Sequence, residues 1–168
     1  MKVVFLDIDG VLNSTRTCVA HGEYPSGFTP EDMLMFDQTA ISLIGAIVRA
    51  AGAKVVLSSA WRVTYSFINA AKAFDLPIIG STPVFDASRG AQIKYWLDEH
   101  KSDVECYAII DDEVDLLPEQ MPFFVHTDMN EGFLWRDAEK LARLLGLQSA
   151  YDARTHKNKR RCAGLGVI

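Results

Sequence analysis

Five short apolar runs, separated by longer segments, constrain the fold of this sequence more than any other feature. Each run is at most five residues long and is rich in Val, Ile, Leu or Phe, the pattern of a strand that is buried on both faces. The segments between the runs are long enough to hold helices, so we expect parallel pairing with helical crossovers. The runs occupy residues 2–6, 53–57, 76–79, 106–110 and 123–125.

The intervening segments carry helical signals. Thr29 precedes a proline and two acids, which predicts a helix start. Asp37 and Gly52 fit the cap residues at the two ends of a longer helix. Further helical patterns cover residues 63–74, 89–100 and 134–145. Strands that alternate with helices predict an α/β protein: a single Rossmann-like domain with a parallel five-stranded sheet and helices on both faces.

The chain is 168 residues long, which fits one domain. We place that domain at residues 1–148 and a basic C-terminal tail at residues 149–168. No apolar run approaches the roughly 20 residues of a membrane span, and the N-terminus lacks the pattern of a signal peptide. Three cysteines without a CxxC pair favour a reducing compartment, so we expect a cytoplasmic protein with no membrane partner.

Acidic residues follow two of the predicted strands. Asp7 and Asp9 come after the first strand, and Asp111 and Asp112 come after the fourth. Ligands bind beyond the carboxyl ends of the strands in such sheets, at the point where the strand order reverses. Clustered carboxylates repel one another unless a cation neutralises them, and oxygen ligands with waters favour Mg²⁺. A lone aspartate is more often a turn residue, but two pairs directly after strands predict a magnesium site.

Candidates for phosphate binding follow the second and third strands. Ser58 could donate a hydrogen bond to a phosphate oxygen, with Ser59 and the start of the next helix beside it. Either Arg89 or Lys94 could neutralise phosphate charge. They are five residues apart and so do not share a helix face, and spacing alone does not choose between them.

These pieces, in this order, resemble the haloacid dehalogenase (HAD) superfamily of phosphohydrolases. The first motif of that superfamily matches residues 3–13, which contain Asp7-Ile8-Asp9-Gly10, and its fourth motif matches residues 109–112. Ser58 matches the second motif, and Arg89 or Lys94 the third. The sequence around residues 58–62 and 89–97 is similar to small HAD domains of bacterial and phage RNA-repair proteins. The Lys94 spacing is also similar to the phosphatase domain of phage polynucleotide kinase.

The resemblance implies a Mg²⁺-dependent phosphatase that forms an aspartyl-phosphate. Asp7 would be the nucleophile and Asp9 the general acid and base. The phosphate oxygens would bind Ser58, with Ser59 beside it, and either Arg89 or Lys94. The implied metal ligands are Asp7, the backbone carbonyl of Asp9, Asp111 and Asp112.

The sequence leaves no room for a large cap domain, because residues 13–36 and 80–88 are short. The resemblance then implies an open active site that suits macromolecules or a covering partner. Residues 13–28, which include Tyr24, could form a small flap within residues 13–36 that contacts substrate, or could be a plain surface loop. We interpret Trp61, Trp96 and Trp135 as packing residues.

Charge is unevenly distributed along the chain. Residues 1–153 hold 12 basic and 22 acidic residues, a net of −10, whereas residues 154–161 hold five basic residues. A basic tail on an acidic body can contact nucleic acid, but eight residues are a short footprint for a polyanion, so a solvated terminus is the simpler interpretation. The tail and the open site favour a nucleotide or polynucleotide substrate.

Other functions fit the same motifs less well. A phosphoprotein or a small phosphate ester could be the substrate instead. A non-catalytic module that binds phosphate or a partner is the alternative from a different class. A receiver domain takes its phosphoacceptor from the third strand, and here that strand leads into Gly80-Ser81-Thr82.

Overall fold

A computed structural model describes residues 1–153 of the chain. Five parallel strands form one sheet in the order β3-β2-β1-β4-β5. The first three strands extend the sheet in one direction, and the chain then crosses to the other side of β1. The strand order therefore reverses between β1 and β4, at the sheet edge that carries the acidic residues. The strands are β1 (Lys2–Leu6), β2 (Lys54–Leu57), β3 (Ile78–Ser81), β4 (Cys106–Asp111) and β5 (Phe124–His126).

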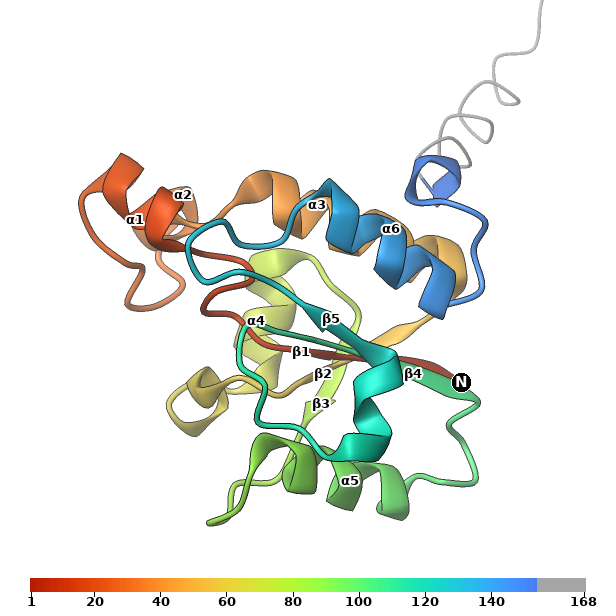
Figure 1. The fold of residues 1–168 in the computed structure, drawn as a ribbon. Helices are drawn as coiled ribbons and strands as arrows, with labels where there is room; N and C mark the ends of the chain where they lie inside the picture. The colour runs from red at the N-terminus through yellow and green to blue at the C-terminus, as the bar shows by residue number, and fades with distance from the viewer. Residues whose placement is uncertain (154–168) are drawn as a thin grey trace, which may run out of the picture.

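Helices cover both faces of the sheet, as the sequence predicts (Figure 1). Three of them, α3, α4 and α6, contribute to the core on one face, and α5 packs on the other. Two short helices, α1 and α2, lie in the segment between β1 and α3. The helices are α1 (Thr15–His21), α2 (Pro30–Met35), α3 (Gln38–Ala51), η1 (Ala60–Val63), α4 (Phe67–Phe74), α5 (Arg89–Glu99), η2 (Pro118–Phe123) and α6 (Trp135–Leu144).

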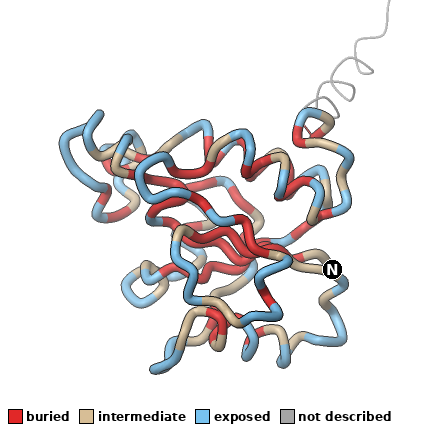
Figure 2. The backbone as a smooth tube through the Cα atoms, in the orientation of Figure 1, coloured by how far each residue is buried: buried red, intermediate tan, exposed pale blue. Residues whose placement is uncertain are grey.

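The central strand divides its side chains between two cores. Val4 and Leu6 pack beneath α3 and α6, whereas Val3 and Phe5 pack against Ile93 of α5. This alternation follows from the two-residue period of a strand. Figure 2 shows the buried residues concentrated along the sheet and on the helix faces turned toward it. The sheet is thus covered on both sides, and only its strand ends are open for chemistry.

The long helix α3 confirms the predicted caps. The side chain of Asp37 accepts hydrogen bonds from the backbone N–H groups of Thr39 and Ala40. Gly52 ends the helix in the left-handed conformation, with φ of 66°, which glycine adopts without strain.

Two predicted elements have bounds that differ from the structure by more than one residue. The third strand begins and ends two residues later than residues 76–79, because strand pairing uses backbone groups and continues through Gly80 and Ser81 after the apolar side chains stop. The predicted helix over residues 63–74 begins only at Phe67. Ser66 caps it by accepting a hydrogen bond from the N–H of Asn69, a cap that the apolar pattern did not reveal.

The C-terminal part of the described chain still belongs to the body of the protein. Ala150 and Ala153 are buried in the core beneath α3 and α6. The packed body therefore extends past the boundary expected at residue 148. The basic segment at residues 154–161 lies outside the described residues. Along residues 1–153, no helix combines the length and the apolar character that crossing a membrane requires.

Candidate active site

Backbone hydrogen bonds bring the predicted motifs together at one edge of the sheet. The strand ladder continues for one residue past each strand: the N–H of Asp7 donates to the carbonyl of Ile110, and the N–H of Ser58 donates to that of Leu6. Asp7, Ser58 and Asp111 therefore lie on neighbouring strands. They meet where the strand order reverses, the expected place for a ligand in an open parallel sheet.

Three acidic side chains form a cluster at this edge. One carboxylate oxygen from each of Asp7, Asp111 and Asp112 lies within 4.8 Å of the other two. Asp7 and Asp111 are buried, and Asp112 is half-buried. Burial, together with the charge of Asp7, raises the pKa of Asp111 from its ordinary 3.8 to about 7. The same two causes raise the pKa of Asp112. The negative charge is thus only partly compensated by the protein.

A hard divalent cation fits this cluster. Magnesium is held by one or more carboxylates together with waters and substrate oxygens, and it accepts only oxygen ligands readily. The three convergent oxygens supply such ligands, and the raised pKa of Asp111 shows that ionising all three is unfavourable without a further positive charge. The residues present therefore match the metal that the sequence predicts.

Arg89 is the cation that the structure joins to this cluster. Its Nη1 lies 2.6 Å from Oδ2 of Asp111 and 3.4 Å from Oδ2 of Asp7. Burial alone would lower the pKa of Arg89, but the charges of Asp7 and Asp111 raise it by more. The net effect is a raised pKa, so the guanidinium stays charged. Lys94 instead pairs with Asp98 at 2.9 Å on the exposed side of α5. The structure thus separates the two candidates for the third motif.

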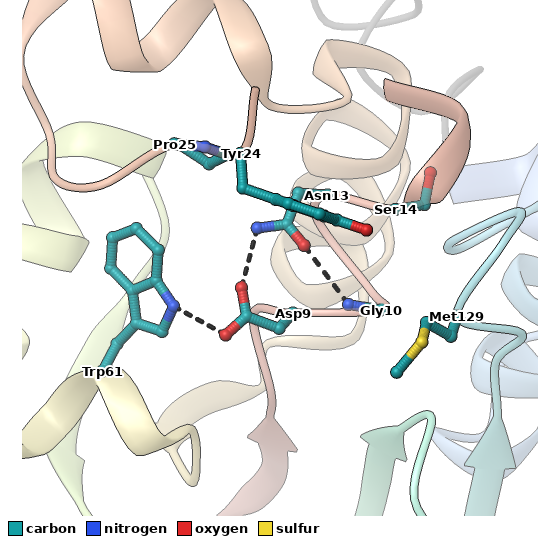
Figure 3. Close-up of a pocket in the computed structure, with 8 residues that line it drawn as sticks. All are labelled: Asp9, Gly10, Asn13, Ser14, Tyr24, Pro25, Trp61 and Met129. Atoms are coloured by element: carbon teal, nitrogen blue, oxygen red, sulfur yellow. Dashed lines mark hydrogen bonds between the residues drawn. The ribbon is translucent and has the colours of Figure 1, made fainter. Parts of the chain in front are cut away.

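Asp9 stands apart from the three clustered carboxylates. It is exposed, and both of its oxygens accept hydrogen bonds: Oδ2 from Nε1 of Trp61 at 2.9 Å, and Oδ1 from Nδ2 of Asn13 at 2.8 Å (Figure 3). A carboxyl oxygen has a second lone pair, so Asp9 can still carry or accept a proton. Trp61 was interpreted as a packing residue, and it is also a hydrogen-bond donor at the site.

Two buried hydroxyls at the same edge have no hydrogen-bond partner among the described residues. These are Oγ of Ser58 and Oγ1 of Thr82, which follow the neighbouring strands β2 and β3. An unsatisfied buried hydroxyl is costly and is a common sign of a ligand or water position. Ser59 differs, because its hydroxyl accepts a hydrogen bond from the N–H of Trp61 and caps η1.

Arg62 fixes the backbone around these hydroxyls. Its guanidinium donates to the carbonyl oxygens of Ser58, Ser59 and Thr82, and to the side chain of Gln92 on α5. Burial and the charge of Arg89 lower the pKa of Arg62. Because Arg62 donates to carbonyl groups that follow both strands, it holds the ends of β2 and β3 together. The sequence did not indicate this role.

Gly10 allows the first motif to approach Asp112 closely. Its φ is 67°, and a Cβ at this position would lie 2.3 Å from Cγ of Asp112. The hydroxyl of Thr127 donates to the carbonyl of Gly10, and Nε2 of His126 bonds to the carbonyl of Asp112 at 2.9 Å. His126, the last residue of β5, and Thr127 therefore hold the two acidic loops in place.

A pocket of about 440 Å³ opens beside Asp9. Its wall includes Tyr24 and Pro25, so part of the predicted flap does face the site. That segment is folded: Asp32 accepts hydrogen bonds from the N–H groups of Ser26 and Thr29. The residues that line the pocket are Asp9, Gly10, Asn13, Ser14, Tyr24, Pro25, Trp61 and Met129 (Figure 3).

Comparison with known proteins agrees with this geometry. Searches among curated proteins and among solved structures give no match. A family model described as the HAD domain in Swiss Army Knife RNA repair proteins matches residues 3–138, which run from β1 into α6. At the level of the family, the match supports a hydrolase with phosphatase-type chemistry. With its strand-end motifs in the predicted order and place, the chain belongs to the HAD domains of Swiss Army Knife RNA repair proteins.

Proposed function

We propose that this protein is a Mg²⁺-dependent phosphomonoesterase that works through an aspartyl-phosphate on Asp7. The proposal rests on the set of side chains that meet at the carboxyl ends of β1, β2 and β4. There, the buried carboxylate of Asp7 lies beside two further acids, a charged Arg89 and the unpartnered hydroxyl of Ser58. A nucleophile, a cation site and phosphate donors thus lie at adjoining positions.

The proposed reaction has two displacements. In the first, a carboxylate oxygen of Asp7 attacks phosphorus, the bond to the ester oxygen breaks, and the leaving oxygen takes a proton from Asp9. In the second, Asp9 accepts a proton from water, whose oxygen attacks phosphorus and breaks the bond to Asp7. Inorganic phosphate leaves, and both aspartates return to their starting forms.

The surrounding side chains suit the charge that develops on the phosphoryl oxygens. Arg89 and the hydroxyl of Ser58 would bind those oxygens, and Asp111 and Asp112 would hold Mg²⁺ with Asp7. Bound Mg²⁺ supplies charge neutralisation between the nucleophile and the phosphate. Arg89 already bridges Asp7 and Asp111, so it restricts where the nucleophilic oxygen can lie.

We further propose nucleic-acid or nucleotide phosphates as substrates. The matching family model describes domains of RNA repair proteins, and the described residues carry no large cap over the site. A terminal phosphate on a polynucleotide could therefore approach Asp7 from solvent.

Phosphate release by the purified protein tests the reaction. The panel contains an aryl phosphate, nucleoside 3′- and 5′-monophosphates, a 3′-phosphorylated oligonucleotide and a phosphopeptide, each with Mg²⁺ or with chelator. We expect Mg²⁺-dependent release that Asp7→Asn abolishes and the matched exposed control Asp75→Asn retains. Equal release by wild type and Asp7→Asn would refute the nucleophile. If the folded protein releases phosphate from none of these substrates, the result would support a non-catalytic binding module instead.

A further inference from the structure

The pocket beside Asp9 lies where the organic part of a substrate must go. If phosphorus is attacked by Asp7 and the leaving oxygen is protonated by Asp9, the group attached to that oxygen extends beyond Asp9. The pocket begins there, since Asp9 and Gly10 form part of its lining. Its volume of about 440 Å³ falls within the roughly 300–1,000 Å³ typical of small-molecule sites. The inference that follows rests on the proposed function.

Two aromatic rings from different parts of the chain face this pocket. Trp61 comes from η1 after β2, and Tyr24 comes from the segment between α1 and α2 (Figure 3). Trp61 is held in place, because its ring contacts those of Phe28 and Phe36 and its N–H donates to Asp9. Met129 approaches from the loop after β5. A fixed indole, a more exposed phenol and a thioether form an apolar wall that suits a flat, polarisable group.

The remaining lining is polar and nearly uncharged. Asn13 and Ser14 are almost fully buried and already hydrogen-bonded, Asn13 to Asp9 and Gly10, and Ser14 to the N–H of Thr17. Asp9 is the one charged side chain among the lining residues that the structure describes. Within residues 1–153, no lysine or arginine lines the pocket to receive a second phosphate or an acidic peptide. A neutral flat ring matches this apolar, nearly uncharged wall better than an anionic group does.

We infer that this pocket is a nucleoside subsite, in which a nucleobase stacks on Trp61 or Tyr24 while its phosphate lies on Asp7. Base–aromatic stacking is tolerant of sequence, because every base has a π-face. The subsite therefore selects for a base near the phosphate and not for a particular base. Tyr24 and Trp61 act as specificity-determining residues, and the flap at residues 13–36 gains a function through Tyr24.

Matched substrates with and without a base test this inference. Nucleoside 3′- and 5′-monophosphates are compared with the 3′- and 5′-phosphates of abasic ribose, and the base preference is the ratio of their kcat/KM values. We expect a preference of about tenfold or more for one pair. Tyr24→Ala should reduce that ratio several-fold, mainly through KM, and Tyr24→Phe should retain it because the ring remains. Tyr151→Ala, a similarly exposed tyrosine elsewhere, should leave the ratio unchanged.

Several results would overturn the inference. A wild-type ratio near one for both pairs would show that the base is not bound. Equal loss of activity on nucleotide and abasic substrates in Tyr24→Ala would show a structural role only. A preference for a phosphotyrosine peptide over both nucleotides would assign the pocket to a protein substrate.

Binding separates this inference from the proposed reaction. Calorimetry on Asp7→Asn with Mg²⁺ compares a nucleoside monophosphate with its abasic counterpart, so no turnover is needed. Base-dependent binding that Tyr24→Ala weakens would support the subsite even if the wild type released no phosphate. Equal affinity for the two ligands would refute the subsite even if the wild type proved to be an active phosphatase.

Discussion

The raised pKa of Asp111 predicts that the metal-free protein loses stability as pH rises. The pKa is about 7 in the folded state and 3.8 ordinarily, so the folded protein binds this proton more tightly than the unfolded chain does. Below about pH 4 both states hold the proton and there is no penalty. Between about pH 4 and pH 7 only the unfolded state ionises, so the free energy of unfolding falls with pH. At about 1.4 kcal/mol per pKa unit, the full loss is about 4 kcal/mol above pH 7.

Asp111→Asn isolates this effect, because the amide does not titrate. Denaturant unfolding of both proteins in chelator, from pH 4 to pH 8, gives the difference in their free energies of unfolding. We expect the variant to gain about 4 kcal/mol relative to wild type across this range. Groups remote from the cluster cancel in the difference, which therefore reports the titration of Asp111 together with the carboxylates that interact with it. Asp75→Asn, at a side chain that is 99% exposed and outside the site, is the matched control.

Adding Mg²⁺ should reverse the loss in wild type alone. The cation favours the ionised carboxylates, so saturating Mg²⁺ at pH 8 should raise the wild-type free energy of unfolding by about 3 kcal/mol at 100 times its Kd. Asp111→Asn removes the negative charge of one proposed metal ligand, so Mg²⁺ should raise the free energy of unfolding of this variant only slightly. The reasoning is refuted by a difference between variant and wild type that does not change with pH in chelator.

Four other substitutions test separate contacts in and around the site. Gly10→Ala places a Cβ 2.3 Å from Cγ of Asp112 at a positive φ, so denaturation should show a loss of about 1–3 kcal/mol and titration a weaker Mg²⁺ affinity; wild-type affinity would contradict this. Arg89→Met should lower kcat/KM at least about 100-fold, whereas Lys94→Met, at an exposed ion pair, should leave the rate intact; similar rate losses in both would argue against the assignment. Trp61→Phe keeps a ring but removes the N–H to Asp9, so kcat should fall about tenfold with KM little changed, and an unaltered kcat would remove this donor from the reaction.

The sheet edge was largely predictable from sequence, because strands have a simple local signature. Short apolar runs fixed β1 and β4, and the residues that follow them had to share an edge if those strands were neighbours. The pairing of Phe5 with Ile109 confirms that they are. Helix caps such as Asp37 were equally local, since cap and helix are adjacent in the chain.

The choice between Arg89 and Lys94 needed the structure, because both positions suit a helix cation. The loop after β4 separates the positions of the two side chains: the N–H of Arg89 donates to Asp115, which places the first turn of α5 beside the acidic cluster. Lys94, further along the helix, pairs with Asp98 one turn away. Sequence spacing gives the angle between the two residues but not the orientation of the helix.

The leaving-group side of the site is less predictable for a physical reason. Asp9 and Trp61 are 52 positions apart, and their hydrogen bond depends on the route of η1, which has no apolar period. Tyr24 reaches the same pocket from a third segment. No local sequence pattern predicts that Asp9, Trp61 and Tyr24 lie together, because each one taken alone is an ordinary residue outside the regular strands and long helices.

The two sides of the site therefore rest on different kinds of structure. The acids that would carry the chemistry follow buried parallel strands, where backbone hydrogen bonds leave them little freedom. The residues that face the organic group come from η1, the loop after β5 and the flap at residues 13–36, none of which is a strand of the sheet. Substitution at Tyr24 should therefore alter which phosphate ester is preferred, whereas substitution at Asp7 should abolish hydrolysis of every ester.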